Sequence, residues 1–132
     1  MPFQEILKSA NEENEEVQPL SMPMGILYLS SYLKKYNDIG EISLLDFYYL
    51  LSNLKDYDSI EEFIGRNIKN NVGYIPDIIA ISLIFSVSYP FYELVVDILR
   101  NTWPKAIIIV GGIHATNCTR ILLNNLSFAV RF

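Results

Sequence analysis

The first clear periodicity in the chain begins after Pro23. Apolar side chains recur at steps of three or four residues, at Ile26, Leu29, Leu33 and Tyr36. Such spacing places them on one face of a helix. Residues 37–40 read Asn-Asp-Ile-Gly, which are residue types that end a helix. We therefore predict a helix that begins at Met24 and has Lys34, Lys35 and Asn37 at its polar end.

The next two patterns predict a strand and a second helix. Residues 41–46 alternate and then become apolar, which favours a short strand. Ser59 and Glu62 have the spacing of a capping box, in which the hydroxyl and the carboxylate satisfy free amides of a first helical turn. Apolar residues follow at helical spacing, at Ile60, Phe63, Ile64 and Ile68. The predicted helix ends at residues 70–73, Asn-Asn-Val-Gly.

Two continuous apolar runs, residues 78–83 and 106–110, predict further strands. Runs of this kind are typical of strands buried on both faces of a parallel sheet. Between them, Pro90 suits the first turn of a helix, and we expect its buried face to hold Phe91, Leu94, Val95, Ile98 and Leu99. A short helix carrying Ile121, Leu122 and Leu123 and a strand over residues 127–131 complete the pattern.

Helices and strands therefore alternate along the chain, which implies an α/β fold with a parallel sheet covered on both faces. The acidic run at residues 11–16, Asn-Glu-Glu-Asn-Glu-Glu, has no periodic apolar neighbours and indicates a solvated loop. We predict a flexible acidic segment over residues 1–22 and one α/β domain over residues 23–132.

Composition narrows the classes of function. The net charge is −5, and the ten lysines and arginines form no stripe, so we expect no nucleic-acid partner. No apolar run approaches the roughly 18 residues that span a membrane, and we expect no membrane partner. The single cysteine, Cys118, excludes a disulfide framework and favours a cytoplasmic protein. One cysteine cannot hold an iron–sulfur cluster, so we expect none in this chain.

Polar and small residues follow the predicted strands. They are Asp46 after the first, Ser82 and Ser86 around the end of the second, and Gly111 and Gly112 after the third. Since parallel strands end at one edge of a sheet, these residues are expected at a common crevice, where ligands bind in open α/β sheets. Bare glycine backbone can lie against a flat ligand. The alternatives are a tight turn without a ligand, a loop-capping carboxylate and ordinary strand-end hydrogen bonds of the serines.

His114 is the only histidine of the chain, and it could be a general base, a metal ligand or a polar contact. No second histidine or carboxylate cluster accompanies it, so we expect no triad or metal site from this chain alone. Cys118 is interpreted as a small, partly buried residue, with a reactive thiol as the alternative. Neither a G-x-G-x-x-G nor a P-loop pattern is present, which counts against a dinucleotide or nucleoside-triphosphate site.

Three stretches share a likeness to one family. Residues 23–33 read PMGILYLSSYL, residues 76–82 read PDIIAIS, and residues 109–116 read IVGGIHAT. Together they resemble the cobalamin-binding domain found at the N-terminus of many radical SAM enzymes, with the last stretch as its most recognisable signature. The resemblance covers residues 20–131 in the family's order and spacing.

The resemblance implies a flavodoxin-like or Rossmann-like three-layer parallel sheet with the corrin ring of cobalamin over its carboxyl edge. It implies that the nucleotide tail lies near Ser82, Ser86 and the Gly111-Gly112 turn. The expected cofactor contacts are Ser82, Ser86, Gly111, Gly112, His114 and Ala115. In the intact system the domain would hold methylcobalamin for methyl transfer, or cobalamin in a related radical role.

Two departures from related patterns limit that implication. The mutase type of cobalamin domain places a histidine under cobalt through Asp-x-His-x-x-Gly, which this chain lacks, so we expect no cobalt ligand from it. The radical SAM cluster motif, Cys-x-x-x-Cys-x-x-Cys, is also absent. We therefore expect the chain not to be catalytic alone and to act with a radical SAM catalytic domain or subunit.

Both ends differ from the family's usual pattern. Members begin with an apolar strand, whereas Met1-Pro2-Phe3 stands where that strand would end. Residues 128–131 resemble a strand that runs on into a glycine–glutamate pair. We expect a chain truncated at both ends and lacking the first strand. Two other functions stay open: a cofactor-free interaction or regulatory module with this fold, and a nucleotide- or sugar-phosphate-binding domain that uses the Gly-Gly turn.

Overall fold

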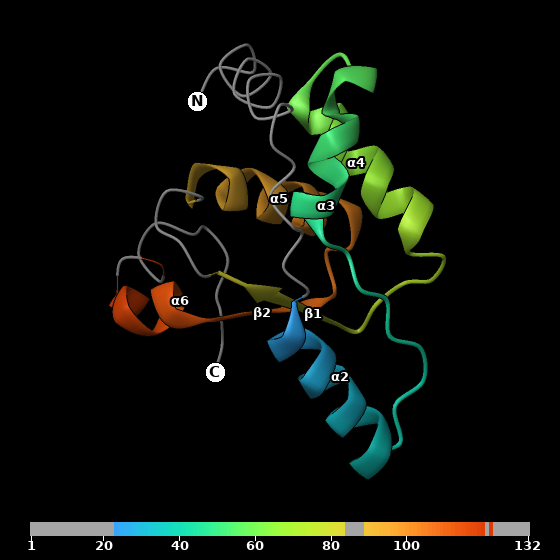
Figure 1. Cartoon of the computed structure of the whole chain (residues 1–132), viewed down its shortest axis with the longest axis vertical. Coiled ribbons are helices and arrows are strands. Elements are labelled where there is room, and N and C mark those ends of the chain that lie inside the picture. Colours follow the sequence, from blue (N-terminus) through green and yellow to red (C-terminus); the bar gives the residue numbers. More distant parts are fainter. Residues whose placement is uncertain (1–22, 84–88, 121, 123–132) are drawn as a thin grey trace. The chain divides into compact units, whose positions relative to one another are not determined.

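A computed structural model of the chain describes residues 23–83, 89–120 and 122 (Figure 1). The chain divides into two compact units, Met1–Val72 and Gly73–Phe132. The described part of the first unit holds helices and extended segments, and that of the second holds a strand–helix–strand arrangement followed by a short helix. The predictions for residues 84–88 and 123–132, including the last strand, lie outside the described residues.

In the described part of Met1–Val72, helix α2 spans Met24–Tyr36 and confirms the helix predicted from its apolar periodicity. Lys34 and Lys35 stand in its last turn, where cations interact favourably with the helix dipole. The helix ends where Asn37 becomes extended and its amide donates to the Leu33 carbonyl at 3.0 Å. None of the α2 side chains is fully buried.

Residues 41–46 form no strand, so the strand predicted there is wrong. A strand is held by its ladder to a neighbour, and alternation along one segment supplies no such partner. Among the described residues, the only strands pair with each other and not with this segment. The chain instead continues into the short helix α3, Phe47–Leu50, and the 3-10 helix η2, Leu51–Asp56.

Helix α4 spans Ile60–Asn71 and begins with the predicted cap. The Glu62 amide donates to the Ser59 hydroxyl at 3.1 Å, and the Glu62 carboxylate accepts from the Asp58 amide at 3.0 Å. Phe63 is fully buried, and its ring meets that of Tyr57 edge-on, with centroids 5.3 Å apart. The cap and the aromatic contact together fix the start of α4 against the preceding turn.

In Gly73–Phe132, strands β1, Ile78–Ser82, and β2, Ile107–Gly111, are parallel and connected by helix α5, Tyr89–Thr102. The register runs from Ile78 beside Ile107 to Ser82 beside Gly111. The α/β class and the parallel pairing predicted from the alternation of elements are therefore confirmed. Helix α6, Ile113–Asn117, follows β2 directly.

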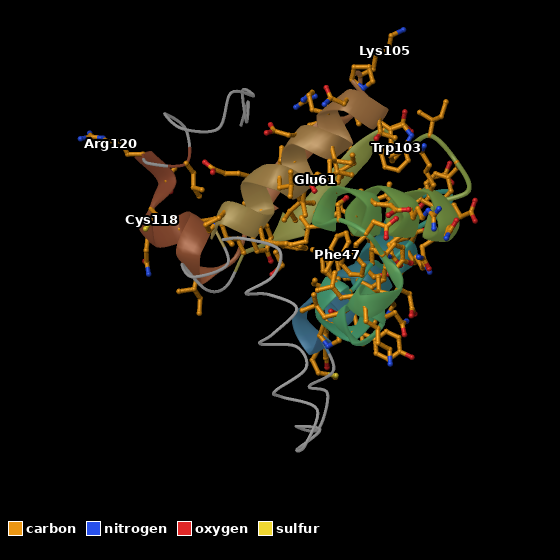
Figure 2. All side chains as sticks on the ribbon, turned by 90° about the horizontal axis from the view of Figure 1, so that it is seen from above. Phe47, Glu61, Trp103, Lys105, Cys118 and Arg120 are labelled. Carbon is orange, nitrogen blue, oxygen red and sulfur yellow. The ribbon has the colours of Figure 1, made fainter. Side chains whose placement is uncertain are left out.

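Helix α5 is hydrogen-bonded to the sheet at both of its ends. The Tyr92 hydroxyl donates to the carbonyl of Ser82, the last residue of β1. Near the other end, the Arg100 guanidinium donates to the Ala106 carbonyl at 3.0 Å, just before β2. Figure 2 shows Trp103 and Lys105 at this second end, and Cys118, which follows α6, toward the first. The helix thus spans the strands from their carboxyl edge to their amino edge.

In both strands the residues of one face are more exposed than those of the other, although only Ile108 of β2 is fully buried. Ile108 is 2% exposed, whereas its neighbours Ile107 and Ile109 are 55% and 43% exposed, and Ile78 is 58% exposed. The apolar runs predicted strands buried on both faces, and the exposed positions correct that expectation. An apolar run shows what a strand can bury, but burial also needs a covering layer, which the run itself does not encode.

Candidate functional site

Two predicted site residues meet at the carboxyl edge of the strand pair. Ser82 and Gly111 are the last residues of β1 and β2 and lie opposite each other in the register. The Leu83 amide continues the ladder by donating to the Gly111 carbonyl at 2.8 Å. Gly111 is exposed and Ser82 is half-buried. Their position is the edge at which open α/β sheets bind ligands.

The two adjacent glycines have different surroundings. A Cβ built on Gly111 meets no atom within 4 Å, so its backbone borders open space. A Cβ on Gly112 would lie 2.5 Å from the Leu83 carbonyl oxygen, and Gly112 has a φ of +100°, which side chains rarely adopt. Gly112 is therefore required by the turn itself, whereas Gly111 leaves bare backbone toward solvent.

Helix α6 carries the next two candidates. Its first turn is fixed by Thr116, whose amide and hydroxyl both donate to the Gly112 carbonyl, at 3.1 and 3.2 Å. Ala115 is buried at 9% exposure, so its methyl group is largely covered. His114 lies in the first turn of this helix, but its side chain, like the whole of Ser86, lies outside the described residues.

Asp46 does not end a strand. Its carboxylate accepts a hydrogen bond from the Tyr49 amide at 3.3 Å, and its carbonyl accepts from the Leu50 amide at 3.1 Å. These contacts place it at the N-terminus of α3, where a carboxylate satisfies free amides. The capping interpretation is confirmed, and the strand-end position is wrong.

Tyr92 is a residue at this edge that sequence reasoning missed. Its hydroxyl binds the Ser82 carbonyl, although it was not among the apolar residues expected to face the core from α5. The pattern gives no signal for this contact, because it depends on where the start of α5 meets the end of β1. The tyrosine adds a hydrogen bond to the same strand end that carries Ser82.

Among the described side chains, those at this edge are uncharged. Ser82, Gly111, Gly112 and Ala115 contain no ionisable side chain. Cys118 is a free thiol and is half-buried, which confirms its interpretation as a partly buried residue. Across the described residues, no three His, Cys, Asp or Glu side chains gather into a possible metal site. In the same part of the chain, no helix has the length and apolar character needed to cross a membrane.

The parallel strand pair and its connecting helix define an α/β protein, a class that binds ligands at the carboxyl ends of its strands. A comparison with protein families identifies which family of that class this chain belongs to. The family profile of the B12 binding domain matches residues 14–131. The chain belongs to the B12-binding domain family, and this membership supports cobalamin as its ligand. It confirms that the three motifs belong to a cobalamin-binding type of domain. Searches among curated proteins and among solved structures gave no significant match.

Proposed function

We propose that the chain binds cobalamin with the corrin ring over the carboxyl edge of β1 and β2. The observation that carries the proposal is Gly111, an exposed strand-end residue whose missing side chain leaves open space beside Ser82. A broad planar ring can approach closest where no Cβ intervenes. The proposed contacts are Ser82, Ser86, Gly111, Gly112, His114 and Ala115.

The roles of these residues are to bind and orient. The Ser82 hydroxyl can donate or accept a hydrogen bond, and we assign it to the polar periphery of the cofactor or to its nucleotide tail. Bound cobalamin supplies methyl-transfer or radical chemistry at cobalt. This chain contributes binding surface to that chemistry, and a radical SAM catalytic domain or subunit contributes the iron–sulfur cluster. The likeness of residues 23–33, 76–82 and 109–116 to that branch supports the association.

The test is a titration of the purified chain with hydroxocobalamin, followed by desalting and by the corrin absorbance spectrum. We expect retained corrin and a shifted spectrum. The informative variant is Gly111→Val, because its side chain enters open space and leaves the fold intact. We expect it to raise the Kd by about tenfold or more, which corresponds to a loss of at least about 1.4 kcal/mol of binding free energy. Gly112 is unsuitable, because a side chain there collides with Leu83.

The matched control is Ile107→Val, an exposed position at the opposite end of the same strand. It should bind cobalamin as the wild type does. A folded wild-type sample that retains no corrin would contradict cobalamin binding, and Gly111→Val binding at wild-type strength would place the ligand elsewhere. The radical SAM association is tested separately, by co-purification with the product of a neighbouring gene that encodes a Cys-x-x-x-Cys-x-x-Cys motif.

A further inference from the structure

The carboxyl end of β1 is held from two sides. On the β2 side, the Leu83 amide donates to the Gly111 carbonyl at 2.8 Å, and Gly112 packs directly against the Leu83 backbone. On the α5 side, the Tyr92 hydroxyl donates to the Ser82 carbonyl. The Ser82 carbonyl and the Leu83 amide belong to the same peptide group, which is therefore held at both of its polar ends.

The Ser82 carbonyl points to the lateral side of β1 that does not pair with β2, which we call the outer edge of β1. Two hydrogen bonds show which residues of this segment face β2. The Asp77 carbonyl accepts from the Ile107 amide at 2.9 Å, and the Leu83 amide donates to the Gly111 carbonyl. In a parallel ladder, alternate residues direct their backbone groups to opposite edges. If residues 77 and 83 face β2, residue 82 faces the outer edge.

At that outer edge, no strand of the described residues pairs with β1. The Tyr92 hydroxyl takes the place of a ladder donor for the Ser82 carbonyl. A carbonyl in a part-buried position that loses its donor is unfavourable. Removal of the hydroxyl would therefore leave this peptide held from the β2 side alone, by the Leu83–Gly111 hydrogen bond, and the end of β1 less firmly ordered.

We infer that Tyr92 is a positioning residue that holds the end of β1 in the shape that receives the cofactor. This inference rests on the proposed function. Tyr92 acts through the Ser82 peptide, and its effect on affinity comes from preorganisation: a strand end that is already ordered loses less freedom when the ligand binds.

The test compares Tyr92→Phe with Thr102→Val. Each removes one side chain–backbone hydrogen bond of α5, but the Thr102 hydroxyl binds the Ile98 carbonyl at 2.7 Å at the far end of the helix. Two quantities are measured: the Kd for hydroxocobalamin, and the amide hydrogen exchange of Leu83 without cobalamin. We expect Tyr92→Phe to raise the Kd by about three- to tenfold, the range that one lost hydrogen bond allows, and to speed exchange at Leu83.

Thr102→Val should leave the Kd and the Leu83 exchange unchanged. An unchanged Kd in Tyr92→Phe, with a wild type that binds, overturns the inference and leaves the proposed function standing. An equal rise in both variants shows general destabilisation and also overturns it. A raised Kd without faster Leu83 exchange means that the hydroxyl contacts the cofactor directly, which contradicts a positioning role. A folded wild type that binds no cobalamin rejects the proposed function and this inference with it.

Discussion

Gly111 and Gly112 are neighbours in the sequence but face different constraints. Gly112 has a positive φ and lies against the Leu83 carbonyl, whereas nothing occupies the space beside Gly111. The Gly-Gly pair marked the turn correctly from sequence alone. The different constraints on the two glycines could not be predicted, because they depend on Leu83, which the fold brings to the turn from the end of another strand.

This difference predicts that alanine substitutions at the two glycines have unequal effects on the free energy of unfolding. Gly112→Ala should lower the free energy of unfolding by about 1–3 kcal/mol, because it forces a strained φ and a backbone collision. Gly111→Ala should change it by less than about 0.5 kcal/mol. Urea denaturation of both variants measures the difference. Equal destabilisation by the two substitutions would contradict the geometry of the turn.

At the scale of single elements, helix α4 has Ser59 as its N-terminal cap. Ser59→Ala removes the acceptor of the Glu62 amide and should lower the free energy of unfolding by about 1 kcal/mol. Ser43→Ala, at an exposed position outside the helices and strands, is the control and should have little effect. Thermal or urea unfolding followed by circular dichroism gives both values. If both serines prove equally dispensable, the cap does not stabilise α4.

Strand β2 offers a second prediction at this scale. Ile108→Ala removes a buried side chain and should destabilise by about 2–4 kcal/mol. Ile107→Ala, one residue earlier on the exposed face, should cost about 1 kcal/mol or less. The same unfolding measurements compare the two. Similar losses would mean that both faces of the strand are covered in solution.

The elements that sequence predicted best are those with local signals. The helix of Met24–Tyr36 follows from its spacing, that of Ile60–Asn71 from its cap, and the two strands from their continuous apolar runs. Residues 41–46 carried an equally local signal and form no strand, because a ladder partner is not a local property. The capping contact of Asp46 was foreseen only as an alternative to a strand end.

For the whole molecule, the parallel strands of Gly73–Phe132 and the family match over residues 14–131 agree on a B12-binding α/β protein. The single domain predicted over residues 23–132 stays a prediction. Sequence indicated the class because alternating elements allow few sheet topologies. It did not indicate which face of the strands stays exposed or that Tyr92 binds the end of β1, since both depend on packing between distant segments.

The central claim is that cobalamin lies against the carboxyl edge of β1 and β2. The most direct measurement is the change in backbone amide chemical shifts of the isotope-labelled chain when hydroxocobalamin is added. The account predicts that the largest changes fall at Ser82, Gly111 and Gly112, while the amides of Ile78 and Ile107, at the opposite end of the same two strands, change little. Bound corrin that leaves the strand-end amides unmoved, or a folded chain with no shift at any amide, would contradict it.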